Sequence, residues 1–295
     1  MENPLISIIV ITYNSSKYVI ETLESVYNQI YQNIELIVSD DSSIDDTIEI
    51  CERWIDTNRK RFTRVELLKV SENTGISSNC NRGLAAAKGE WVKLIAGDDI
   101  LCPECISTFI QYSKIHFDSR IFFSDVDIFG SDENSFKKKI VRKWLDNSIN
   151  FISTHGTAHE QYKELLFENI VCAPSAFLHR DTILRLGWFD EEIKLMEDYP
   201  LWINATKNGY TIRCIKQRLV KYRVNDSSIQ ISKYYSISHE LFLQKYIFKN
   251  VLFYIFLPFI NQLRVNRKDL LLIGILKVFT LPQRLLFRSR KKLKR

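Results

Sequence analysis

Glu90-Trp91-Val92-Lys93-Leu94-Ile95-Ala96-Gly97-Asp98-Asp99-Ile100-Leu101 is the stretch of sequence that decides the fold, because an apolar strand ends here in two adjacent carboxylates. In an open α/β sheet, ligands bind outside the carboxyl ends of the strands. Two acids at such an end indicate a bound divalent cation with oxygen ligands, and Gly97 lets the backbone approach a ligand closely. The alternative is that Asp98 and Asp99 cap a helix beginning near Pro103.

The residues before this stretch alternate between strand and helix patterns. Strands are predicted at 5–11, 34–38 and 65–70. Helices are predicted from the apolar spacing between Val19 and Ile30, after Asp45-Asp46, and over Gly75–Ala87. Such alternation is typical of βαβ units and a parallel sheet. We therefore predict an α/β fold with a mixed, mainly parallel central sheet flanked by helices. Asp40-Asp41, after the second strand, then shares an edge of the sheet with Asp98-Asp99.

The pattern loosens in the second half of the chain. A helix is predicted over Pro103–His116 and a strand over Ile121–Ile128, whereas the polar residues 131–165 are interpreted as an irregular substrate-binding loop region. His155 and His159 are assigned to this loop, because the zincin motif fails at Lys163. Glu197-Asp198 opens an amphipathic segment, either as chemical groups or as an acid pair stabilised by a helix dipole.

Composition and charge restrict the class of protein. A chain of 295 residues with 45% hydrophobic and 26% charged residues is typical of a globular protein with a large core. Residues 282–295 hold seven cations and no acid, so a net charge of +6 leaves about −1 for the rest, and a nucleic-acid partner is not expected. The six cysteines are expected to be reduced and buried, and Cys102–Cys105 lacks the context of a redox or zinc motif. Without a signal peptide pattern at the N-terminus, the expected compartment is the cytoplasm.

The chain changes character from residue 240 onward. Apolar runs at 250–260 and 270–281 are shorter than the ~20 residues that a membrane-spanning helix requires, and both are followed by arginine and lysine. This pattern predicts that 240–295 is an amphipathic, basic tail that binds an anionic membrane surface. The alternative is a pair of amphipathic helices packed on the body.

Several motifs in a fixed order give the chain a family resemblance. They are Ser7-Ile8-Ile9-Val10-Ile11-Thr12-Tyr13-Asn14, Asp40-Asp41-Ser42-Ser43-x-Asp45-x-Thr47, Asn73-x-Gly75, Ala87-Lys88-Gly89-Glu90-Trp91, Asp98-Asp99 and Glu197-Asp198. Over roughly residues 5–225 the chain resembles the inverting family 2 glycosyltransferases of GT-A fold. The resemblance implies a GT-A domain at 1–239, with a nucleotide-binding half at 1–101 and an acceptor-binding half at 102–239.

The resemblance also implies roles for individual residues. Tyr13 would stack near the nucleobase, Asp41 would accept a hydrogen bond from it, Asp99 would hold a divalent metal (Mn²⁺ or Mg²⁺), and Asp198 would be the catalytic base. The other residues expected to contact the nucleotide sugar are Ile11, Asn14, Asn79, Asn81 and Asp98.

Two positions depart from the family pattern. Ala96 stands where the first acid of an Asp-x-Asp motif is usual, so Asp99 is expected to carry most of the metal contact and Asp98 to lie nearer the ribose and sugar. Cys80 stands where the family often has arginine, which leaves Arg82 or Asn79 as alternatives for that contact.

The function implied is inverting transfer of one sugar from a nucleoside-diphosphate sugar, expected to be a UDP-sugar, to a hydroxyl of a glycan. The tail and family habit suggest a polyprenyl-linked acceptor in surface polysaccharide (O-antigen or capsule) synthesis, on the inner face of the plasma membrane. A processive synthase would carry Q-x-x-R-W, which is absent after Asp198, and the Gly-rich opening of a nucleotidylyltransferase is absent too. The alternative from another class is a non-catalytic sugar-nucleotide-binding or scaffold protein.

Overall fold

The computed structural model describes residues 3–130, 135–224 and 239–248. The chain divides into a large unit, Met1–Leu243, and a second unit, Gln244–Arg295. Most of the second unit lies outside the described residues, and so do the two apolar runs of the predicted tail. Within the described ranges, no helix combines the length and apolarity needed to cross a membrane.

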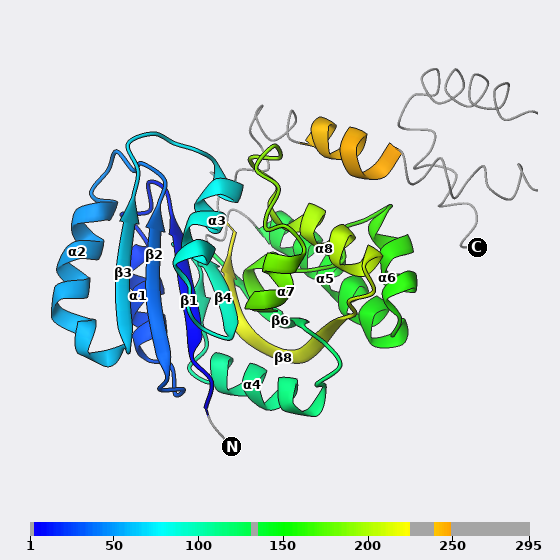
Figure 1. Ribbon diagram of the computed structural model, residues 1–295, viewed down its shortest axis with the longest axis horizontal. Helices are drawn as coiled ribbons and strands as arrows, with labels where there is room; N and C mark the ends of the chain where they lie inside the picture. Colours follow the sequence, from blue (N-terminus) through cyan, green and yellow to red (C-terminus); the bar gives the residue numbers. More distant parts are fainter. Residues whose placement is uncertain (1–2, 131–134, 225–238, 249–295) are drawn as a thin grey trace, which may run out of the picture. The chain divides into compact units, whose positions relative to one another are not determined.

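The first half of the large unit is a parallel sheet of four strands. Its elements are β1 (Ile6–Thr12), α1 (Val19–Tyr27), β2 (Ile34–Asp40), α2 (Thr47–Asn58), β3 (Arg64–Lys69), α3 (Ile76–Ala86) and β4 (Trp91–Ala96). The strands lie in the order β3-β2-β1-β4 and all pair in parallel. β1 and β2 are almost wholly buried, as expected of strands covered on both faces. Figure 1 shows α1 on one face of these strands and α3 on the other.

The first helix is shorter than its predicted pattern. α1 ends at Tyr27, and Ile30 is 62% exposed although it continues the apolar spacing. Gln29 takes the interior position instead, because its side-chain amide donates to the carbonyls of Ser25 and Cys102 and accepts from the N–H of Ile106. A polar side chain that satisfies three backbone groups thus displaces the apolar one.

The second half completes a mixed sheet. Its elements are β5 (Ile100–Leu101), α4 (Cys105–Ile115), β6 (Ile121–Phe129), β7 (Phe177–His179), α7 (Arg180–Arg185), α8 (Asp198–Lys207) and β8 (Ile212–Arg223). The full strand order is β3-β2-β1-β4-β7-β6-β8-β5. β7 runs antiparallel to β4 and β6, which joins the two halves into one sheet. The prediction of a mixed, mainly parallel sheet flanked by helices is confirmed.

The prediction of an irregular loop over residues 131–165 is wrong. Two helices lie there, α5 (Ser135–Thr154) and α6 (Ala158–Leu165). α5 buries Leu145 and Ile152, and α6 begins with a capping box between Thr157 and Glu160. The polar majority of these residues faces solvent. His159 therefore lies in α6, not in a loop.

The cysteine prediction holds in part. All six cysteines are free, and four of them are buried, whereas Cys102 and Cys214 are partly exposed. Cys102 and Cys105 form no disulfide. Burial raises the pKa of the Cys105 thiol to about 12, which is contrary to the low pKa of a reactive thiolate.

Candidate functional site

The candidate site lies where β1, β2 and β4 end side by side. Each strand is followed by polar residues: Tyr13 and Asn14 after β1, Asp41 after β2, and Asp98 after β4. Backbone hydrogen bonds hold these ends together, from the N–H of Asp41 to the carbonyl of Thr12 and from the N–H of Gly97 to the carbonyl of Ile11. The ring of Tyr13 is 49% exposed at this edge. The structure thus brings Ile11, Tyr13, Asn14, Asp41 and Asp98 to one end of the sheet.

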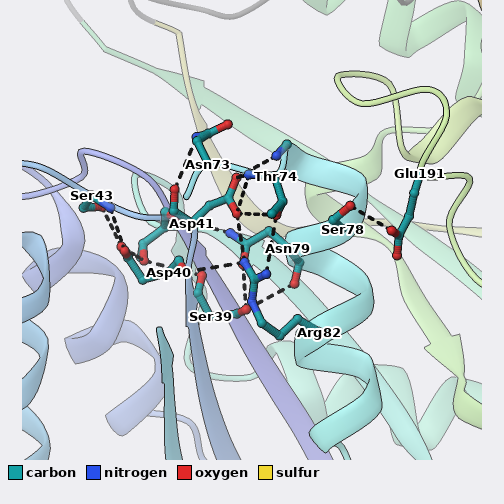
Figure 2. A network of polar contacts seen from close by, with 12 residues as sticks. Ser39, Asp40, Asp41, Ser43, Asn73, Thr74, Ser78, Asn79, Arg82 and Glu191 are labelled. Atoms are coloured by element: carbon teal, nitrogen blue, oxygen red, sulfur yellow. Dashed lines mark hydrogen bonds and ion pairs between the residues drawn. The ribbon is translucent and has the colours of Figure 1, made fainter. Parts of the chain in front are cut away.

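The carboxylate of Asp41 is the centre of a dense hydrogen-bond network (Figure 2). It is 2% exposed and accepts from the N–H of Thr74 at 3.0 Å, the N–H of Gly75 at 2.8 Å and the hydroxyl of Thr74 at 2.6 Å. The guanidinium of Arg82 donates to the same carboxylate at 2.9 Å. Gly75 has φ +92°, a backbone conformation that favours glycine. Asp41 therefore fixes the segment before α3 against the end of β2.

Asn79 and Arg82 project from α3 toward this cluster. The Asn79 Oδ1 accepts from the Ser39 hydroxyl at 2.6 Å and from Arg82 at 2.9 Å, and its Nδ2 donates to the carbonyl of Thr12 at 3.2 Å. Both alternatives for the missing arginine thus lie beside Asp41. The Nε of Arg82 is buried without a partner among the described residues, which leaves one donor of this cluster unused.

Asn81 lies on another side of α3. Its Nδ2 donates to the Phe189 carbonyl at 2.9 Å and to Glu191 at 2.7 Å, and its Oδ1 accepts from the N–H of Phe189. The Ser77 hydroxyl donates to the carbonyl of Ile193 at 2.7 Å. α3 therefore holds residues 189–193 against the nucleotide-binding half. The hydrogen bonds of Asn81 to Phe189 and Glu191 could not be predicted from its sequence motif.

Asn14 and Asp40 stabilise the turn after β1. The Asn14 side chain accepts from the N–H of Ile44, and its own N–H donates to the Ser43 hydroxyl. Asp40 accepts from the hydroxyls of Thr12 and Ser43 at 2.7 and 2.6 Å. Asn14 has φ +49°, so these contacts hold it in a left-handed conformation that asparagine tolerates.

The adjacent acids Asp98 and Asp99 have different environments. Asp99 is 1% exposed, and its Oδ1 accepts from the backbone N–H of Arg223 at 2.8 Å. Burial, followed by the charge of Asp98, raises the pKa of Asp99 well above its usual range. Asp98 is partly exposed. Its side chain is therefore the more accessible carboxylate of the two.

The interpretation that Asp98 and Asp99 cap the following helix is wrong. β5 intervenes, and α4 has Glu104 at its N-cap position. What holds the pair is Arg223, whose Nε donates to the Asp98 carbonyl at 2.8 Å. Its guanidinium lies 4.1 Å from the ring of Tyr18 and 4.3 Å from that of Phe129. Arg223 was not found from the sequence, because it lies on β8, more than 120 residues from Asp99.

Glu197 and Asp198 stand at the start of α8. The Oδ2 of Asp198 accepts from the Nδ2 of Asn169 at 2.9 Å and from the Trp202 indole at 3.4 Å. Burial raises the pKa of Asp198, and these hydrogen bonds offset the rise only in part. Burial and then Asp198 raise the pKa of Glu197 to about 8. Glu197 makes no side-chain capping bond, but backbone hydrogen bonds at the start of the helix lower both pKa values and offset part of the rise.

Backbone contacts bring the segment before α8 to the start of α3. The N–H of Ser77 donates to the carbonyl of Lys194 at 3.4 Å, three residues before Glu197. Burial and then Glu197, Asp198 and Asp41, in that order, raise the pKa of Cys80 on α3. Burial and then charges that include Asp99, Asp98 and Asp198 raise the pKa of Tyr222 on β8. The charges of the strand-end acids and of the acids of α8 thus act on the same two side chains.

The donor atoms suit a hard divalent ion that takes further ligands from elsewhere. Across the described ranges, no group of three or more His, Cys, Asp or Glu side chains could enclose a metal. Asp98 offers partly exposed carboxylate oxygen, the ligand type that Mg²⁺ and Mn²⁺ prefer, and Mg²⁺ commonly combines one or two carboxylates with substrate phosphates. The residues fit an ion that arrives with a phosphate.

Comparison with known sequences identifies relatives along most of the chain. The family model described as Glycosyl transferase family 2 matches residues 7–187. An uncharacterised glycosyltransferase of Methanocaldococcus jannaschii is 24% identical over 264 residues, covering 86% of this chain and 85% of that protein. Escherichia coli WfaP, a UDP-Glc:alpha-D-GlcNAc-diphosphoundecaprenol beta-1,3-glucosyltransferase, is 28% identical over 249 residues, covering 84% of this chain and 86% of that protein.

Comparison with solved structures gives the same architecture. Staphylococcus aureus TarS 1–349 in complex with UDP-GlcNAc superposes with a TM-score of 0.59 at 22% identity, covering 80% of this chain and 64% of that one. The mannosyltransferase PcManGT from Pyrobaculum calidifontis in complex with GDP-Man and Mn²⁺ superposes with a TM-score of 0.56 at 20% identity, covering 77% of this chain and 59% of that one. This chain thus spans less than two thirds of these two structures, and the likeness is one of fold.

Proposed function

This chain belongs to glycosyl transferase family 2 and is a glycosyltransferase of the GT-A fold, and from that premise we propose that it transfers one sugar, with inversion, from a nucleoside-diphosphate sugar to a hydroxyl of a lipid-linked glycan. One observation carries the proposal. A hydrogen-bonded carboxylate at the end of β2, Asp41, and a carboxylate pair of raised pKa at α8 are both linked to the start of α3, the first through the N–H of Gly75 and the second through the hydrogen bond from the N–H of Ser77 to the carbonyl of Lys194. The first suits binding of a donor, and the second suits removal of a proton.

Donor binding is assigned to the first half. In our proposal Tyr13 stacks on the nucleobase, Asp41 and its Arg82 partner read the base edge, and Asn79 holds both in place. Ile11, Asn14 and Asn81 complete the predicted donor set. The exposed ring of Tyr13 and the buried network around Asp41 support this assignment. UDP is the expected nucleotide, supported by the UDP-sugars named for WfaP and TarS.

The metal assignment is revised by the geometry. The sequence pointed to Asp99, but that carboxylate is buried and bound to the backbone of Arg223. We assign the ion contact to the partly exposed Asp98 and give Asp99 the role of fixing the turn. When bound, Mn²⁺ or Mg²⁺ would act as a Lewis acid that neutralises the leaving diphosphate. The Mn²⁺ in the PcManGT complex supports this cofactor.

Asp198 is assigned as the general base. Its carboxylate receives the proton of the acceptor hydroxyl as the oxygen attacks the anomeric carbon and the nucleoside diphosphate leaves. A raised pKa makes this carboxylate a stronger base, so transfer of the proton from the acceptor hydroxyl to Asp198 is more favourable. Asn169 and Trp202 orient it from one side. A single base and direct displacement give inversion.

The names of two relatives support a proposal for the acceptor, and the basic tail supports one for the cellular location. WfaP is named for a diphosphoundecaprenol-linked sugar, and the Bacillus subtilis relative TuaG, 22% identical over 231 residues, is named for teichuronic acid biosynthesis. We propose a polyprenyl-linked glycan acceptor in surface polysaccharide synthesis, such as O-antigen or capsule. The enzyme would work on the cytoplasmic face of the plasma membrane, with its basic tail on anionic lipid.

A donor screen tests the proposal. The protein is incubated with UDP-, GDP- and dTDP-sugars, Mn²⁺ or Mg²⁺, and polyprenyl-diphosphate-linked sugars, and release of nucleoside diphosphate is measured. We expect release with one UDP-sugar that depends on the acceptor. A non-catalytic sugar-nucleotide-binding or scaffold protein would bind a donor by calorimetry yet release nothing with any acceptor, and that result would replace our proposal.

A further inference from the structure

The outward face of α5 combines large apolar side chains with lysines. Phe136 and Ile140 are 73% and 54% exposed and stand one helical turn apart. Lys139 and Lys143 are exposed and fall on the same face, since positions 136, 139, 140 and 143 follow the i, i+3, i+4, i+7 spacing. We call these four residues the α5 face. The opposite side of the helix is buried through Leu145, Ser148 and Ile152.

Among the described residues, no acid pairs with the two lysines of the α5 face. Arg142 is paired with Asp125 and Asp146 at 2.8 and 2.7 Å, whereas no acid in the described ranges pairs with Lys139 or Lys143. Beside the helix lies a hollow of about 600 Å³, with a lining that carries five cations and two carboxylates. The cations that line it are Lys138, Lys139, Arg142, Lys143 and Arg218. The surface is therefore electropositive around an apolar pair.

Core packing does not explain two exposed apolar side chains of this size between unpaired lysines. A solvated helix would carry polar residues there, and a protein partner recognised through apolar contact alone would not need the lysines. Helices that lie in a membrane interface insert such apolar residues at the acyl boundary while lysines meet anionic headgroups. The charge complementarity selects a negatively charged bilayer surface over a neutral one.

We propose that the α5 face is a membrane-docking surface of the catalytic unit, with an anionic lipid bilayer as its partner. It is separate from the predicted basic tail, and it does not depend on the proposed reaction. Phe136 and Ile140 would enter the interface while Lys139 and Lys143 contact lipid phosphates. Docking through α5 would hold the half of the enzyme that carries Asp198 at the bilayer surface, where a lipid-linked acceptor lies.

Vesicle partitioning of the full chain tests this surface. Sedimentation is measured with phosphatidylcholine vesicles that contain or lack phosphatidylglycerol, for wild type, Phe136→Ser/Ile140→Ser and Lys139→Glu/Lys143→Glu. Lys139→Glu/Lys143→Glu is expected to lower the partition coefficient on anionic vesicles by roughly tenfold or more, because each lysine near an anionic surface contributes about a factor of five. Phe136→Ser/Ile140→Ser is expected to lower it as well, because binding strength increases with the apolar area buried in the interface. The tail is present in every protein, so its contribution cancels.

Matched controls make the outcome specific. Ile115→Ser/Phe117→Ser removes another exposed apolar pair, and Lys60→Glu/Lys216→Glu reverses two other exposed lysines; we expect little change from either. Soluble glycerol phosphate should not displace the protein from vesicles, and nucleotide binding should stay normal in all variants. Wild-type partitioning of both α5 variants, equal losses in the controls, or displacement by glycerol phosphate would overturn the proposal. Partitioning as expected from a wild-type protein that transfers no sugar to any acceptor would count against the proposed reaction alone.

Discussion

The two halves of the large unit treat their key carboxylates in opposite ways. Asp41, at the end of β2, accepts from two backbone N–H groups, a hydroxyl and a guanidinium. Asp198, at the start of α8, accepts from an amide, an indole and backbone N–H groups, pairs with no cation among the described residues, and has its pKa raised by burial. A carboxylate with a cationic partner and several donors is fixed in position, whereas one with neutral donors and a pKa raised by burial can exchange a proton.

In the proposed mechanism, this difference separates donor binding from proton transfer. In the first half, Asp41 and Asp99 are each bound to the backbone of a neighbouring segment, which fixes the strand ends. The second half leaves Glu197 and Asp198 side by side, with the pKa of Glu197 raised to about 8. If the comparison is right, variants in the two halves should fail in different measurements.

Asp198→Asn should give the largest effect. It keeps the size of the side chain but removes its basicity, so turnover should fall by roughly 10²–10⁴. Nucleotide affinity, measured by calorimetry, should stay close to that of wild type. Glu197→Gln, at the adjacent position, is the matched control and should reduce turnover less. Near-normal turnover of Asp198→Asn would mean that the base lies elsewhere.

Lys93→Met removes a buried amine at the boundary between the two halves. Lys93 on β4 is fully buried, its Nζ donates to the carbonyls of Leu94 and Pro174, and burial lowers its pKa from near 10.5 to about 8. The unfolded chain therefore binds more protons between pH 8 and 10.5, so the free energy of unfolding of wild type should rise with pH across that window. Relative to Lys93→Met, the gain should approach roughly 3 kcal/mol. Denaturant titrations of both proteins at pH 7.5 and 10 measure it, and parallel pH dependence would show that Lys93 is not buried as described.

Asp41→Ala should weaken nucleotide binding, which we assign to the first half. It leaves the N–H groups of Thr74 and Gly75 and the guanidinium of Arg82 without their acceptor, so nucleotide affinity should fall by about 1–3 kcal/mol. Calorimetry with UDP measures the loss. Asp198→Ala is the control from the other half and should bind UDP normally. Unchanged affinity of Asp41→Ala would place the nucleobase away from the end of β2.

Asn169→Ala should give the smallest effect. The hydrogen bond from Asn169 favours the ionised form of Asp198, so its loss should raise the pKa of that carboxyl further. Turnover, which falls as the pH drops through this pKa, should then fall at a higher pH than in wild type. At neutral pH we expect a loss of roughly three- to tenfold. The pH–rate profiles of the two proteins measure the shift. If the rate falls at the same low pH in both proteins, Asn169 does not position the base.

The halves also differ in how far the sequence predicts them. The strands of the first half are continuous apolar runs buried on both faces, and their polar ends are contiguous motifs, so the parallel sheet and its strand-end acids were predictable. α5 was missed because its buried positions, such as Leu145 and Ile152, are sparse among polar residues. Asp98 and Asp99 are neighbours in sequence, yet only the pairing of β5 with β8 buries one and leaves the other partly exposed. Contacts of Arg223 and Asn169 join residues far apart in the chain, which no local pattern encodes.

The anomeric configuration of the product tests the central claim most directly. In the proposed mechanism one base, Asp198, acts opposite one leaving group, so the sugar changes configuration in a single displacement. With the donor found in the screen, nuclear magnetic resonance of the early product should show a β-linked sugar from an α-linked donor. An α-linked product would contradict direct displacement and the assignment of Asp198 as the base.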